Sequence, residues 1–206
     1  MFFLTTLISF GQECLIPNEY TIIIEKSGDL DNDGVDEKVI VYDTNRVTDF
    51  GNEREIVILK NKKGEWVEWQ KSKNAILKSK EGGPMGEPFE GIEIKDGILS
   101  ISFYGGSNWK WAYTDKYKFQ NNQFELIAYS SSYFMICNSS HSVDFNVSTG
   151  KLTSTKKYEE CKNDDQKITK TEAESFYKKG VVLTLQNRKE KETKIVTPKY
   201  GRIIYL

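Results

Sequence analysis

Residues Gly91–Tyr104, which read GIEIKDGILSISFY, decide the class of fold that this chain adopts. Two apolar runs of strand length, Gly91–Lys95 and Ile98–Tyr104, lie on either side of Asp96–Gly97. An Asp-Gly pair between two such runs favours the tight turn of a two-residue β-hairpin. The stretch therefore predicts two antiparallel strands joined by a tight turn.

Similar runs recur along the chain and are separated by turn signals. Asn121 and Asn122 lie between two of these runs, and Thr149–Gly150 lies between two others. Successive hairpins of this kind favour an antiparallel meander. The other predicted strands are Tyr20–Glu25, Lys38–Asp43, Glu55–Lys60, Trp66–Trp69, Ala75–Lys78, Trp109–Phe119, Phe124–Ser130, Val143–Val147, Leu152–Lys156, Val181–Gln186 and Arg202–Tyr205.

The sequence predicts one helix, at about Glu172–Lys178. Thr169 or Thr171 can cap its start, and Gly180 suits its end. Hydrophobic residues make up 38% of the chain and aromatic residues 13%, which is enough for a core and suits pleated surfaces. We therefore expect a single, mainly β domain over residues 13–206. It would form an antiparallel meander, sandwich-like or a partly open barrel sheet, with one short C-terminal helix.

The first twelve residues, MFFLTTLISFGQ, carry no charge. The apolar run Phe2–Phe10 is too short to span a bilayer, and the small residue Gly11 follows it, as in a secretory signal. We expect residues 1–12 to be a signal peptide and the mature chain to begin near Gln12 or Glu13. The product would be secreted or periplasmic, without stable membrane insertion. No Lys or Arg precedes the run, so an upstream start or a buried terminal strand is the alternative.

The chain has three cysteines, Cys14, Cys137 and Cys161. In an oxidising compartment two of them would pair and one would be left over. Cys137 and Cys161 flank a predicted hairpin, so we expect the disulfide between these two. The alternative is three buried thiols.

The most specific motif is Asp29–Glu37, which reads DLDNDGVDE. Its alternating carboxylates, from Asp29, Asp31 and Asp33, suit Ca²⁺, which takes about six to eight oxygen ligands. Gly34 permits the sharp turn that such a loop needs. The alternative is an acidic turn between two strands that binds nothing.

A strand-like run, Lys38–Tyr42, follows this loop where a helical calcium hand would have a helix. The motif therefore resembles the strand-flanked calcium loops of integrin-type FG-GAP and VCBS repeats. Those loops more often have Asp at the ninth position, so Asp36 is an alternative to Glu37. The loop occurs once, and no propeller is implied. The ligands that the resemblance implies are Asp29, Asp31, Asp33, the backbone carbonyl of Val35, and Glu37.

The aromatic strand Trp109–Phe119 carries a second candidate site. On a strand, Trp109, Trp111, Tyr113, Asp115, Tyr117 and Phe119 would share one face. Such a stripe is more often the core face of a sheet. The alternative is that Trp109, Trp111 and Tyr113 bind a ligand by stacking on sugar rings or on a partner. The neighbouring segments Gly86–Ile92 and Tyr104–Trp111 are similar to a pattern in uncharacterised exported bacterial proteins, which implies no known activity.

Catalytic chemistry has little support in the sequence. His141 is the only histidine, and no Gly-x-Ser-x-Gly pattern accompanies it. A zinc site made of Cys137, His141 and Cys161 would have no recognised spacing. Net charge is −1, from 29 basic and 30 acidic residues, which argues against nucleic-acid binding.

The leading interpretation is a non-catalytic, calcium-stabilised, secreted or periplasmic domain that binds a protein or a glycan. One alternative is a secreted hydrolase or carbohydrate-binding protein that uses the Glu81–Glu93 loop and the aromatic strand Trp109–Phe119. Another is an exported immunity or inhibitor protein.

Overall fold

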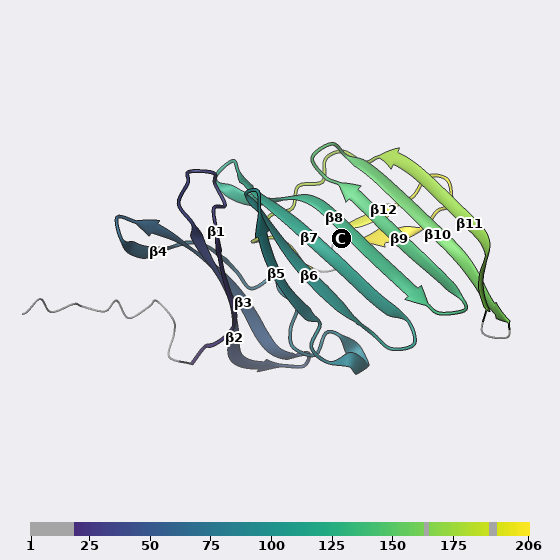
Figure 1. The fold of residues 1–206 in the computed structure, drawn as a ribbon, viewed down its shortest axis with the longest axis horizontal. Helices are drawn as coiled ribbons and strands as arrows, with labels where there is room; N and C mark the ends of the chain where they lie inside the picture. Colours follow the sequence, from purple (N-terminus) through teal and green to yellow (C-terminus); the bar gives the residue numbers. More distant parts are fainter. Residues whose placement is uncertain (1–18, 163–164, 190–192) are drawn as a thin grey trace, which may run out of the picture.

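The computed structural model describes residues 19–162, 165–189 and 193–206. The expected signal peptide and Cys14 lie outside these residues. The described strands form three antiparallel sheets (Figure 1). The four-stranded sheet contains β1 (Thr21–Gly28), β2 (Glu37–Thr48), β3 (Gly51–Lys62) and β4 (Glu65–Ser72). The seven-stranded sheet contains β5 (Phe89–Lys95), β6 (Ile98–Gly106), β7 (Lys110–Gln120), β8 (Gln123–Met135), β9 (Ser139–Asn146), β10 (Lys151–Lys162) and β11 (Asp165–Tyr177). The third sheet pairs β12 (Lys194–Val196) with β13 (Ile203–Tyr205), and a 3-10 turn, η1, spans Gly83–Met85.

In both large sheets each strand pairs with the next one along the chain, which confirms the predicted antiparallel meander. The hairpin turns explain this order. Asp96 and Gly97 have φ values of 52° and 72°, and Asn121 and Asn122 have 52° and 61°. Two successive residues with positive φ are what a tight primed hairpin turn requires. These turns therefore fix the register of the strands that they join.

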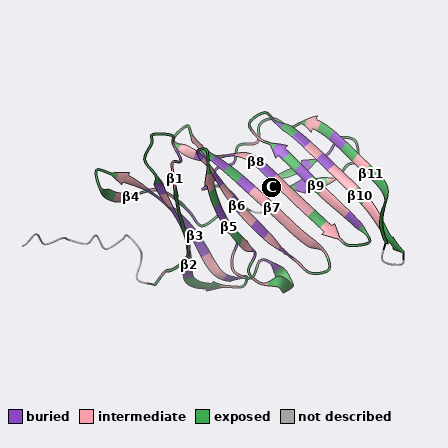
Figure 2. Ribbon diagram, viewed as in Figure 1, coloured by how far each residue is buried: buried purple, intermediate pink, exposed green. Residues whose placement is uncertain are grey.

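The two large sheets share one hydrophobic cluster between their inner faces. Figure 2 shows buried residues alternating along the strands, as the period of two requires. Trp69 from β4 contacts Phe119 from β7, with ring centres 4.3 Å apart. At the end of β1, a Cβ on Gly28 would lie only 2.6 Å from Ile94 Cγ2 of β5. The sheets thus meet closely at β1 and β5.

The chain after β11 covers the rest of the inner face of the seven-stranded sheet, behind β8–β10 in Figure 1. Leu126 N–H donates to the Leu183 carbonyl at 2.8 Å, and the Tyr129 hydroxyl lies 3.3 Å from the Tyr205 carbonyl. Leu185, Ile195 and Leu206 are buried against the sheet, among other apolar residues of this segment.

The predicted helix at Glu172–Lys178 is wrong, because residues Asp165–Tyr177 form strand β11. Glu172 and Glu174 turn toward the inner face, and Glu172 pairs with Arg202 there. β11 pairs with β10 along its whole length, from Lys151↔Tyr177 to Lys162↔Asp165. Helix caps and end charges contribute only about 1 kcal/mol each, so this pairing outweighs them. Within the described residues no helix reaches seven residues.

Two predicted strands are also wrong. Ala75–Lys78 is irregular, although Ala75, Ile76 and Leu77 are buried as an apolar run should be. Val181–Gln186 runs beside β8 and makes an isolated bridge between Thr184 and Glu125. Both segments fill the core with apolar side chains without joining a ladder.

A disulfide joins Cys137 to Cys161, as the sequence predicts. It links the turn after β8 to the end of β10, and the two Cα atoms are 5.1 Å apart. A disulfide suits an oxidising, extracellular or periplasmic environment. In the part of the chain that the structure describes, no helix has the length and apolar character needed to cross a membrane.

Candidate functional site

The acidic loop Asp29–Glu37 joins β1 to β2. Gly34 has φ of 85°, which a turn of this sharpness requires. The Asp29 carboxylate accepts the Asp33 N–H at 3.2 Å and the Gly34 N–H at 2.9 Å. The loop is therefore folded around the side chain of its first aspartate.

Three of the predicted ligands come together in this loop. Asp29, Asp31 and Glu37 each offer a carboxylate oxygen, and these oxygens lie within 4.8 Å of one another. Glu37 is entirely inaccessible to solvent, and its Oε2 accepts the Leu30 N–H at 2.8 Å. Burial raises the pKa of Glu37, with the charges of neighbouring aspartates acting in the same direction.

Two buried oxygens in this loop lack a hydrogen-bond donor within the described residues, Asp31 Oδ1 and Glu37 Oε1. A buried carboxylate oxygen without a donor is costly, and a cation satisfies it well. The cluster therefore fits a hard cation. Val35 lies in the same loop, and its N–H donates to Asp33 Oδ1 at 2.9 Å. The carbonyl ligand role of Val35 stays a prediction.

Lys60, from β3, places its ammonium among the same carboxylates. Its Nζ pairs with Asp31, lies 2.9 Å from Asp33 Oδ2, and lies 3.5 Å from Glu37 Oε1. Burial by itself would lower the pKa of Lys60, but hydrogen bonds to the two aspartates outweigh it and raise this pKa. One lysine balances one of the four carboxylates of Asp29, Asp31, Asp33 and Glu37, so the loop keeps a large negative charge.

The second candidate site is built by strand register. Trp111 lies opposite Tyr133, Tyr133 opposite His141, and His141 opposite Lys156. These residues sit on β7, β8, β9 and β10, so they form one row across a single face of the sheet. Spacing within one strand gives Trp111 and Tyr113 the same face, but the row itself depends on pairing between four strands.

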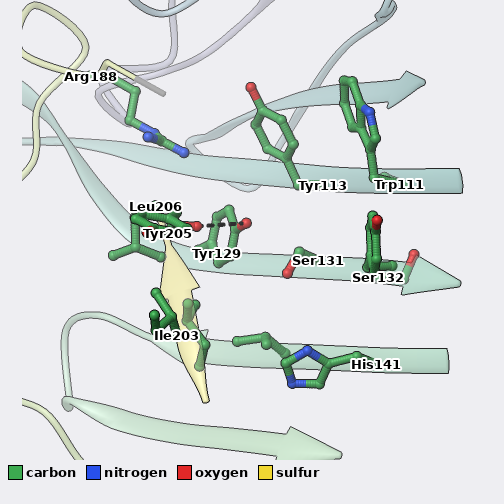
Figure 3. A pocket seen from close by; sticks show the side chains of 14 residues that line it. Trp111, Tyr113, Tyr129, Ser131, Ser132, His141, Arg188, Ile203, Tyr205 and Leu206 are labelled. Atoms are coloured by element: carbon green, nitrogen blue, oxygen red, sulfur yellow. Dashed lines mark hydrogen bonds between the residues drawn. The ribbon is translucent and has the colours of Figure 1, made fainter. Parts of the chain in front are cut away.

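A hollow of about 350 Å³ lies between this row and β13 (Figure 3). Trp111, Tyr113 and His141 line it from the sheet, and Ile203 lines it from the C-terminal strand. A second hollow, of about 270 Å³, shares Tyr133, His141 and Ile203 with the first. We name the continuous depression the aromatic groove, defined by Trp109, Trp111, Tyr113, Tyr133, His141 and Ile203.

The predicted aromatic strand thus divides into two parts. Tyr117 and Asp115 are buried in the core, and Asp115 pairs with the buried Arg188 at 2.8 Å. Trp111 and Tyr113 are half-buried and line the groove. Trp109 also lines it and stacks on Tyr133, with ring centres 4.9 Å apart and planes at 4°. The core-face interpretation therefore holds for one end of the strand, and ligand binding by Trp109, Trp111 and Tyr113 at the other end stays a prediction.

Gly105 makes room for the ring of Trp111. A Cβ at this position would lie 2.4 Å from Trp111 Cζ2. The Gly-rich loop packs on the same place, because Gly106 N–H donates to the Gly82 carbonyl at 2.8 Å. Gly105 therefore lets the ring of Trp111 lie close to the backbone, next to Gly82.

The His141 ring is half-buried. Its Nε2 lies 2.9 Å from Ser154 Oγ. Burial, followed by the charges of Arg202 and Lys156, lowers the pKa of His141, and Glu174 acts in the opposite direction. Ser154 is completely buried, so its hydroxyl is not open to attack a substrate.

The carboxylates of the Glu81–Glu93 loop have structural roles at two positions. Glu81 Oε2 accepts the Lys78 N–H at 2.5 Å, and Glu87 pairs with Arg54. Glu90 and Glu93 are exposed. The structure therefore does not gather these glutamates into a catalytic pair.

The chain has no significant match among protein-family models, curated protein sequences or solved structures. The acidic loop and the aromatic groove therefore carry the functional inference by their own geometry.

Proposed function

We propose that this chain is a non-catalytic binding domain of the extracellular or periplasmic space, stabilised by calcium at the acidic loop. The observation that carries the calcium part is the fully buried Glu37, whose Oε1 has no hydrogen-bond donor within the described residues. It lies in a cluster with Asp29 and Asp31. Oxygen ligands alone, of this number and charge, suit calcium better than a softer metal.

Bound calcium would supply two positive charges where Lys60 supplies one. Asp29, Asp31, Asp33 and Glu37 would hold it together with the backbone carbonyl of Val35, which is the set that the resemblance to strand-flanked repeats implies. The ammonium of Lys60 can swing toward solvent, since its side chain is 20% exposed. Exchange of lysine for calcium therefore needs no change in the strands.

The binding part of the proposal rests on the aromatic groove. Half-buried rings of Trp111 and Tyr113 leave apolar surface beside polar groups, as ligand sites commonly do. A hydrolase is less well supported, because Ser154 beside His141 is buried and Glu81 and Glu87 are engaged in structural contacts.

Thermal unfolding of metal-free protein tests the calcium part. We expect the melting temperature to rise with millimolar calcium and to return with chelator. At calcium ten times its dissociation constant, linkage adds about 1.4 kcal/mol, or roughly 3–6 °C for a chain of this size. Magnesium should do much less, because it demands a tighter octahedral shell.

Two aspartates of the same loop provide a matched pair of variants. Asp31→Asn should abolish the calcium shift, because Asp31 lies in the carboxylate cluster. Asp36→Asn should keep it, because Asp36 is exposed and outside that cluster. Identical melting curves of the unmodified protein in calcium and in chelator would refute calcium stabilisation.

A further inference from the structure

The aromatic groove has a cationic end. Lys156 and Arg202 line the second hollow beside Trp109 and Tyr133. The Arg202 side chain is only 14% exposed, and its Nη2 pairs with Glu172. Its Nη1 is buried and has no hydrogen-bond acceptor in the described part of the chain. A buried guanidinium donor of this kind favours an acceptor brought by a ligand.

The surrounding carboxylates cancel only part of this positive charge. Glu172 is shared between Arg202 and Lys170, whose Nζ lies 2.6 Å from Glu172 Oε1. Glu174 is buried and keeps its negative charge: its Oε2 accepts the Lys199 N–H at 2.9 Å, and its Oε1 has no donor among the described residues. Among the described residues that line the two hollows there is no Asp or Glu side chain. Glu172 also lies opposite Lys156 in the β10–β11 ladder. The three cations Lys156, Lys170 and Arg202 therefore share two carboxylates, Glu172 and Glu174, which leaves one positive charge over.

The other end of the groove offers flat apolar faces with hydroxyl groups beside them. Trp111 and Tyr113 present half-buried rings, and Ser131 and Ser132 lie among the lining residues. Tyr133 is 46% exposed, so the groove is open to water along one side. A saccharide suits such an open groove, since one face of its ring is made of C–H groups and its hydroxyls stay hydrated. A flat aromatic acid would favour an enclosed apolar pocket.

We propose that the aromatic groove binds an acidic saccharide, with a sugar ring on Trp111 and Tyr133 and its carboxylate on Arg202 and Lys156. His141 lies between the two ends of this row, opposite both Tyr133 and Lys156. This inference rests on the binding part of the proposed function and does not depend on calcium.

Calorimetric titration of the purified protein with a tetrasaccharide of galacturonic acid tests the proposal. The methyl ester of the same tetrasaccharide is the matched neutral ligand, and indole-3-acetate is the aromatic acid. We expect the acid form to bind, and the dissociation constant of the ester to be at least about tenfold higher, because the charge-assisted hydrogen bonds are lost.

Variants separate the two ends of the groove. Lys156→Gln and Arg202→Lys should each raise the dissociation constant about tenfold, and the second keeps a cation beside Glu172. Lys157→Gln is the matched control, because Lys157 is exposed and lies next to Lys156 on the opposite face of β10. This control should bind as the unmodified protein does, and circular dichroism should show all three variants folded.

The outcomes distinguish the two proposals. Equal binding of acid and ester would overturn the acidic specificity and leave the groove as a binding site. No binding of either saccharide, or tighter binding of indole-3-acetate, would overturn the proposal that the ligand is a saccharide. The titrations are run both in calcium and in chelator, so that the two proposals are tested separately. If calcium does not stabilise the protein but the saccharide still binds, only the calcium proposal for the acidic loop is refuted.

Discussion

Lys60 controls the charge of the acidic loop in the absence of metal. Its ammonium lies near Asp31, Asp33 and Glu37, and it is also 5.0 Å from the centre of the Trp69 ring. The loop therefore has a built-in cation that would compete with the proposed calcium for the same oxygens. The calcium affinity would then depend on how much more strongly the carboxylates bind calcium than the Lys60 ammonium.

We predict that Lys60→Met makes the metal-free protein less stable and the calcium response larger. Without the ammonium, the carboxylates of the loop repel one another, and calcium no longer has to displace a bound cation. The metal-free melting temperature should fall by roughly 2–4 °C, which corresponds to about 1 kcal/mol. The shift on adding calcium should grow by a similar amount, as read from paired thermal scans.

Lys38→Met is the control for that measurement. Lys38 follows Glu37 in β2, but its ammonium pairs with Glu25 at 3.1 Å and lies 4.9 Å from the centre of the Trp66 ring. The Lys38→Met substitution should change the melting temperature by no more than about 1 °C, both in the metal-free protein and in calcium. A calcium shift that shrinks in Lys60→Met would mean that Lys60 helps to hold the metal and does not compete with it.

The sequence predicts the carboxylates of this site but not the lysine that pairs with them. Asp29, Asp31 and Glu37 belong to one loop, so their spacing is enough to bring them together. Lys60 reaches them through the pairing of β2 with β3, where Lys38 lies opposite Leu59. A single sequence carries no record of that register, so Lys60 could not be assigned to the loop in advance.

At the scale of elements, local turn chemistry was the reliable guide. Asp96–Gly97 predicts its hairpin because both residues tolerate positive φ. β11 was missed for the opposite reason. Its threonines and glutamates favour a helix start locally, whereas its strand form is fixed by β10 and by Arg202, about 30 residues further along the chain. Contacts at long range decide such a segment, and local propensity does not show them.

The disulfide acts at this scale, because it ties the turn after β8 to the far end of β10. We predict that Cys137→Ser combined with Cys161→Ser lowers the free energy of unfolding by about 3 kcal/mol, mainly by releasing the unfolded chain. Urea unfolding of the double variant and of the oxidised protein, both in chelator, gives this difference. Equal midpoints would show that the unfolded chain is no less restricted without the bond than with it.

At the scale of the whole molecule, the acidic loop lies where the two large sheets meet. A Cβ on Gly97, in the turn between β5 and β6, would lie 2.9 Å from the side-chain nitrogen of Asn32. Gly28, just before the loop, makes the close approach to Ile94 of β5. The loop therefore contacts the second sheet directly as well as joining two strands of the first.

From this position we predict that bound calcium slows the local opening of the contact between β1 and β5. Hydrogen exchange followed by mass spectrometry should show faster amide exchange in chelator at both Thr21–Gly28 and Phe89–Lys95, although only the first of these strands adjoins the loop. Amide exchange in Lys151–Lys162, which is far from the contact between β1 and β5, should stay constant. A change confined to residues 29–37 would mean that the loop tightens alone. Faster exchange in both strands would instead mean that the proposed ion joins the two sheets, so that removing it loosens the contact between them.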